Sequence, residues 1–123
     1  MNVVAQAREG YTNVLQPTRT TKDIEFEALA RITRNLQSAA KKAKSGFPEL
    51  AAALHKNRKL WDIFAIEVAN PNNPLDKELR ARIFYLSEFT RTHTSAVLQR
   101  KASVAPLIEI NTAIMRGLRN KGT

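Results

Sequence analysis

The two histidines are the side chains best suited to act as bases or metal ligands near neutral pH, and neither has suitable neighbours. His55 is followed three and four residues later by Arg58 and Lys59. His93 is followed at the same spacing by Ala96 and Val97. A metal pair on a helix would place a second ligand three or four residues away. We therefore expect both histidines to be packing or surface residues, not catalytic groups or ligands.

Other catalytic chemistries lack the residues that they need. The chain has no cysteine, which excludes a disulfide framework, thiol catalysis and cysteine-ligated metal. Its 11 carboxylates occur mainly at expected helix starts or beside cations, and Glu25 and Glu27 are two apart and so lie on different helix faces. The sequence contains no glycine-rich phosphate loop. We therefore expect a protein that is not an enzyme, with no catalytic, cofactor-binding or metal site.

A formal net charge of +9 is the strongest signal in the composition. Such a field attracts nucleic acid, anionic lipid or acidic proteins. The cations are dispersed, however, and clusters of this kind are usually solvated helix faces. Arg31 and Arg34, and likewise Lys56 and Lys59, are spaced at three and can present two cations to phosphates in a salt-dependent way. Nucleic-acid binding therefore stays an alternative, although no zinc finger, basic zipper or RNA-binding aromatic motif occurs.

Length and composition predict one globular domain over residues 1–123. About 100–200 residues per domain is usual, and 43% of the residues are hydrophobic. No run approaches the roughly 18 apolar residues that a membrane span needs. The first residues are interrupted by polar side chains and contain no signal-peptide core. We therefore expect a soluble, cytoplasmic protein without membrane insertion.

The first half of the chain carries apolar residues at helical spacing. Steps of three and four over residues 2–15 predict a short amphipathic helix, and we expect residues 1–19 to form a mobile N-terminal helix and linker. A second helix is predicted from an N-cap at Thr20 to about Lys44. Its apolar residues repeat at every fourth position, at Ile24, Ala28, Ile32, Leu36 and Ala40.

Two further long helices and a short one are predicted downstream. The third begins at Pro48 and contains Trp61, a core anchor whose indole N–H needs a partner. The fourth begins near Pro74 or Leu75 and persists to about Gln99 or Arg100, and the fifth begins near Pro106. The core face of the fourth helix is expected to carry Leu75, Leu79, Ile83, Leu86, Phe89 or Thr90, His93 and Val97. Short connections favour antiparallel neighbours, so the predicted fold class is all-α, a small antiparallel bundle of about four to five helices.

The last helix is the best candidate for a docking surface. Its apolar residues cover more than one narrow face, and an apolar groove on a bundle can receive a partner's amphipathic helix. We expect partner contacts at Ile108, Ile110, Ile114 and Met115. Two alternatives are open: these side chains close the core, or they pair with a second copy of the chain. The oligomeric state is therefore unassigned.

Residues 92–111 are the most distinctive segment of the sequence, and they contain motifs that resemble a known family. The segment contains HTSAVL (93–98) and PLIEIN (106–111), and it is accompanied by NRKLW (57–61), LRARI (79–83) and IMRGL (114–118). In this order and spacing, the segments resemble the FlaF family of flagellar biosynthesis regulators. The likeness covers almost the whole chain, and its C-terminal part is the specific part.

The chain departs from the family pattern at three places. Val68 precedes Ala69 where the family often has a cysteine, and Phe89 replaces a common tryptophan. Lys101 stands where a glycine is often expected. The first two changes stay apolar and leave the expected fold unchanged, whereas the third leaves the turn between the last two helices unpredicted.

The resemblance implies a cytoplasmic, non-enzymatic regulator of flagellin synthesis and export. FlaF-like proteins are thought to bind flagellin in a chaperone-like way and to act together with the regulator FlbT, which controls flagellin synthesis after transcription. Flagellin ends are amphipathic and need shielding before assembly, and a small helical bundle with a groove suits such a partner. Direct binding of flagellin mRNA by a post-transcriptional regulator is the alternative function.

Overall fold

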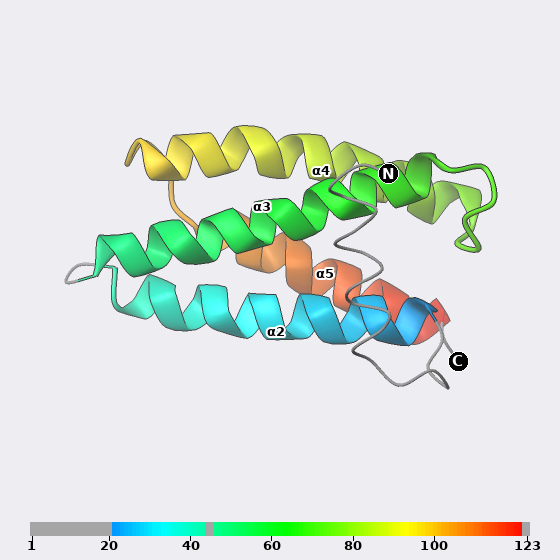
Figure 1. Ribbon diagram of the computed structural model, residues 1–123, viewed down its shortest axis with the longest axis horizontal. Helices are drawn as coiled ribbons and strands as arrows, with labels where there is room; N and C mark the ends of the chain where they lie inside the picture. Colours follow the sequence, from blue (N-terminus) through cyan, green and yellow to red (C-terminus); the bar gives the residue numbers. More distant parts are fainter. Residues whose placement is uncertain (1–20, 44–45, 122–123) are drawn as a thin grey trace, which may run out of the picture.

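Four helices account for most of the chain that the structure, a computed structural model, describes: residues 21–43 and 46–121. They are α2 (Thr21–Lys41), α3 (Phe47–Ala69), α4 (Lys77–Leu98) and α5 (Ala105–Lys121). Consecutive helices run in opposite directions (Figure 1). The predicted all-α antiparallel bundle is thereby confirmed, with no strand in the described ranges. The predicted N-terminal helix and linker at residues 1–19 lie outside those ranges.

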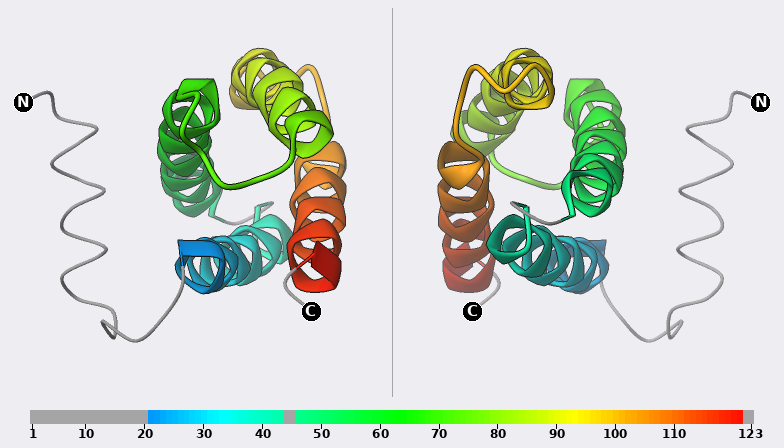
Figure 2. Two further views of the ribbon diagram at one scale, coloured as in Figure 1. Left: turned by 90° about the vertical axis from the view of Figure 1, so that its right-hand side faces the viewer. Right: turned by 90° about the vertical axis from the view of Figure 1, so that its left-hand side faces the viewer.

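The helices stand at the corners of a distorted square when the bundle is viewed from its ends (Figure 2). Helix α3 packs against α2 and α4, and α5 packs against α2 and α4. The α4–α5 pair shares the sparsest contact of these four pairs, and α3–α4 the densest. Helix α3 therefore makes the most extensive contact in the bundle, which is least tightly closed along the α4–α5 side.

The start of α4 differs from the prediction because Asp76 acts as a cap and not as a helical residue. Its backbone is extended (φ −66°, ψ 160°), and its carboxylate accepts a hydrogen bond from the Leu79 N–H at 2.8 Å. This bond satisfies one of the donors that the first helical turn leaves free. Helix α4 consequently begins at Lys77, later than Pro74. Helix α5 begins one residue before Pro106 and, as predicted, is the shortest of the four.

The turn that follows α4 is built on Arg100. Its φ of 61° is left-handed, a conformation that usually favours glycine. The N–H of Lys101 donates to the carbonyl of Ala96 and that of Arg100 donates to Val97, both at 2.9 Å, which is the Schellman pattern that ends a helix. The Arg100 guanidinium also lies 4.3 Å from the centroid of the Phe47 ring. The family position expected to hold glycine therefore lies one residue after the residue that makes the turn, so Lys101 causes no strain.

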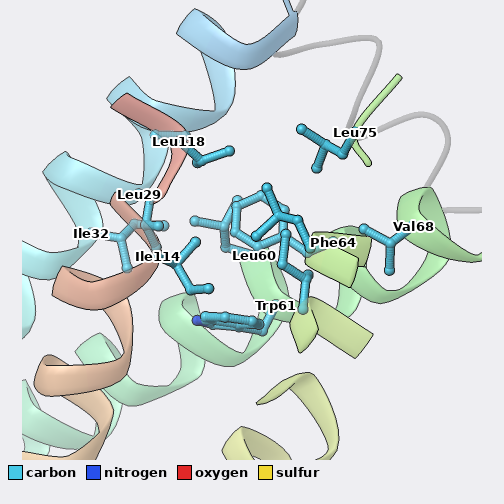
Figure 3. Close-up of a cluster of buried hydrophobic side chains, with 12 residues drawn as sticks. Leu29, Ile32, Leu60, Trp61, Phe64, Val68, Leu75, Ile114 and Leu118 are labelled. Carbon is cyan, nitrogen blue, oxygen red and sulfur yellow. The ribbon is translucent and has the colours of Figure 1, made fainter. Parts of the chain in front are cut away.

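The core consists of two apolar clusters, one towards each end of the bundle. The first cluster takes side chains from all four helices and from the α3–α4 connection, and Figure 3 shows it around Trp61, Phe64 and Ile114. The second cluster lies towards the α2–α3 and α4–α5 connections and includes Leu36, Leu54 and Leu107. Between the two clusters, the middle turns of the helices bury polar side chains.

Substitution of Asp76 by alanine tests the cap. We expect Asp76→Ala to lower the free energy of unfolding by about 1 kcal/mol, because the Leu79 N–H loses its acceptor. Urea denaturation followed by circular dichroism measures the change. Asp76→Asn keeps a capping oxygen and should cost much less. Equal losses in the two variants would show that the charge of Asp76, and not its capping bond, stabilises the helix.

Candidate functional site

A central polar junction lies between the two apolar clusters. It consists of Thr33 of α2, Asn57 and Trp61 of α3, and Asn111 of α5, and each of these residues is buried. The indole N–H of Trp61 donates to Asn111 Oδ1 at 2.9 Å. Asn111 Nδ2 in turn donates to Asn57 Oδ1 at 2.8 Å and to the Thr33 hydroxyl at 3.1 Å. One asparagine therefore joins three helices, and the prediction that Trp61 is a core anchor with a bonded indole is confirmed.

Helix α4 buries polar side chains that have no hydrogen-bond partner. Thr90 and Thr94 are buried, and neither hydroxyl makes a hydrogen bond; the same is true of the Asn57 amide nitrogen. A buried polar group without a partner typically costs about 1–3 kcal/mol. The junction thus bonds α2, α3 and α5 to one another, whereas the buried threonines of α4 make no hydrogen bond to it.

The four predicted contact residues of α5 do not share one environment. Ile114 belongs to the first cluster and is only 3% exposed. Ile110 and Met115 are half-buried against the same cluster, and Ile108 is half-buried against the second cluster. Three of the four therefore keep some accessible surface, while Ile114 is part of the core in this conformation. Their contact with a partner stays a prediction.

The burial of the two junction asparagines, Asn57 and Asn111, is not predicted by the spacing of apolar residues alone. Leu107, Asn111, Ile114 and Leu118 follow steps of four, three and four, which is the spacing of a core stripe. Asn111 occupies a core position in this stripe, but a polar side chain at that position predicts exposure to solvent. For the same reason the sequence does not predict the burial of Asn57, which shares its face of α3 with Leu54, Leu60 and Trp61.

One edge of α4 exposes aromatic side chains towards α5. His93 Nε2 donates to the Ser103 carbonyl in the α4–α5 connection at 2.7 Å, and its ring stacks on Phe89 with centroids 5.2 Å apart. Phe89 is 37% exposed, and Tyr85, one turn earlier, is 69% exposed. The expectation that His93 is a packing or surface residue is confirmed. We call Tyr85, Leu86 and Phe89 the α5-side edge of α4.

The opposite edge of α4 faces α3. Arg91 forms an ion pair with Asp62 of α3 at 3.2 Å. Phe84 and Leu98 lie seven residues before and after Arg91, so they share its face of the helix. Their side chains are 46% and 38% exposed. We call Phe84 and Leu98 the α3-side edge, a comparison surface of similar character on the same helix.

A groove of about 500 Å³ lies between α2 and α3. It brings Arg31 of α2 together with Lys56 and Lys59 of α3, so members of the two cation pairs singled out in the sequence share one surface. Arg34 is not among the residues that line it. The apolar lining comes from Ile32, Leu60 and Ile63.

The described residues offer no candidate for metal chemistry. Among them, no three histidine, cysteine, aspartate or glutamate side chains gather as a metal site would require. His55 is exposed on α3. Among the same residues, no helix has the length and apolarity that crossing a membrane demands.

The fold defines a small all-α bundle with a buried polar junction and exposed apolar edges. The model of the flagellar protein FlaF family matches residues 7–118, which is nearly the full length of the chain. The chain therefore belongs to the FlaF family and is a flagellum-related protein. Comparison with curated proteins and with solved structures found no significant match.

Removal of the Asn111 side chain tests the junction. We expect Asn111→Ala to lower the free energy of unfolding by about 3 kcal/mol, because the Trp61 N–H loses its acceptor and a cavity opens in the core. The matched control is Asn35→Ala, the same change at an exposed position of α2. Urea denaturation followed by circular dichroism compares the two. A difference below about 0.5 kcal/mol would show that the junction does not stabilise the fold.

Proposed function

We propose that this protein binds flagellin in a chaperone-like way and regulates flagellin synthesis and export during filament biogenesis. Membership of the FlaF family supports a flagellar role. The observation that carries the binding proposal is the pair of exposed aromatic side chains, Tyr85 and Phe89, on one edge of a helix. An amphipathic helix of flagellin would cover them and would itself be shielded before assembly.

The α5-side edge is the better of the two edges of α4 for this contact. Leu86 of α4 and Ile110 of α5 both pack from the outside on the first cluster, and both remain half-buried. We propose that a partner helix lies along the sparse α4–α5 contact and covers Tyr85, Phe89 and Ile110. This arrangement keeps Ile110 as a contact residue and leaves Ile114 in the core.

Affinity would come mainly from burial of apolar area, at about 25 cal/mol per Å² before the cost of association is subtracted. The net charge of +9 would hasten the encounter with an acidic partner. We propose that the protein does this in the cytoplasm, without catalysis, and in concert with the regulator FlbT.

The binding edge can be tested by paired substitutions on α4. We expect Tyr85→Ser with Phe89→Ser to weaken flagellin binding at least roughly tenfold, because two exposed apolar contacts are lost. Phe84→Ser with Leu98→Ser is the matched control, because it removes exposed apolar side chains from the α3-side edge of the same helix. Isothermal titration calorimetry with purified flagellin measures both.

Three results would count against the proposal. Absence of binding by the unsubstituted protein at about 100 μM flagellin would refute flagellin binding itself. Equal loss in the two double variants would refute the α5-side edge as the contact. The third result concerns Ile108→Lys. If this variant stays folded but no longer binds flagellin, the flagellin contact lies on the Ile108 side of α5 and not at Tyr85 and Phe89.

A further inference from the structure

We propose that the groove between α2 and α3 is a second docking surface, which binds an acidic amphipathic helix of a protein partner. The groove is separate from the edge assigned to flagellin, because all the described residues that line it belong to α2 and α3. The inference therefore does not rest on flagellin binding.

The floor of the groove is apolar and partly covered by the fold. Ile32 and Leu60 are buried with little exposed surface, whereas Ile63 is half-buried. Ile66 follows Ile63 at the helical step of three and is 50% exposed. The apolar strip of α3 thus continues beyond the groove along the helix, as a bound helix of several turns would require.

The rim of the groove is positively charged. Arg31, Lys56 and Lys59 are exposed residues that line it, and the described lining contains no carboxylate. Lys56 and Lys59 are one turn apart on α3, so their charges lie along the direction of the helix. A helix with an apolar stripe flanked by Asp or Glu would place its stripe on the floor and its carboxylates against this rim.

The chemistry of the lining favours a protein helix over a nucleic acid. Single-stranded nucleic acids bind where aromatic side chains stack on bases beside basic groups. The seven described residues that line the groove include no aromatic ring; apart from the cations and Asn35, they are branched aliphatic side chains. The aliphatic side chains offer apolar area to a helix and no surface on which a base stacks.

The test uses the full chain and a synthetic, fluorescein-labelled peptide of about 18 residues. The peptide carries leucine at i, i+3, i+4 and i+7 positions and glutamate on the flanking positions, so it is an acidic amphipathic helix. A scrambled peptide of the same composition lacks the stripe and serves as its control. Fluorescence anisotropy measures binding at about 50 mM and about 150 mM NaCl, since rim charges are screened by salt.

We expect the amphipathic peptide to bind more tightly than the scrambled one and to weaken with salt. Lys56→Glu with Lys59→Glu should reduce its affinity at least roughly tenfold. The matched control is Lys101→Glu with Arg116→Glu, which makes the same charge change at exposed positions away from the groove. Ile63→Ser tests the floor and should also weaken binding. Circular dichroism checks that each variant keeps its helical content.

Four results would overturn the proposal. Equal binding of the scrambled peptide, or equal loss in both charge-reversal variants, would show general attraction to a basic protein. Displacement of the peptide by a single-stranded RNA of about 20 nucleotides at about 150 mM NaCl would make the groove a nucleic-acid surface. Tighter peptide binding by Tyr11→Asn with Leu15→Asn would show that residues 2–15 of the same chain occupy the groove.

Discussion

The hydrogen bonds of Asn111 are the constraint on which the bundle depends. Apolar side chains alone allow neighbouring helices to slide by a turn at small cost, because one aliphatic contact replaces another. A buried asparagine that must meet Trp61, Asn57 and Thr33 permits only one relative position of α2, α3 and α5. Buried polar groups in helical bundles have their best-attested role in fixing register in this way. Here the bonded set also divides the core into two apolar clusters.

Helix α4 stands apart from this constraint. Its buried threonines make no side-chain hydrogen bonds to the junction, and its contact with α5 is sparse. It is held instead by its dense packing on α3, by the Arg91–Asp62 ion pair, and at its ends by the Asp76 cap and the turn at Arg100. The proposed flagellin contact uses the helix that lies outside the junction, whereas the groove for an acidic helix uses the pair α2–α3, which the junction holds in register. The two surfaces therefore differ in their relation to the junction as well as in charge.

The sequence predicted the architecture because the apolar spacing and the proline-rich breaks are local signals. Its limits are seen at single positions. A repeat of four residues drifts around a helix of 3.6 residues per turn, so the predicted stripe of α2 reached Ala40, whereas Ala39 is the buried residue. The choice between Phe89 and Thr90 for the core face was left open, and the phase of the helix places Thr90 inside and Phe89 outside.

The functional surfaces were harder to predict, because each depends on which helices become neighbours. Lys56 and Lys59 form a pair in the sequence, but only the packing of α2 on α3 sets Arg31 beside them. Asn57 and Asn111 are 54 residues apart, and no local pattern indicates that they bond. Ile114 was expected at a docking surface with its neighbours, but its side chain faces the core.

Trp61 gives the molecule a built-in reporter. It is the chain's only tryptophan, it is fully buried, and its single polar atom is engaged by another helix. Its fluorescence emission therefore depends on whether water reaches the middle of the bundle. A partner that lies on the outer surface leaves that emission unchanged, whereas a partner that opens the middle of the bundle to water shifts it to longer wavelength. Intrinsic fluorescence thus distinguishes capture on an intact bundle from capture by an opened one, with no added label.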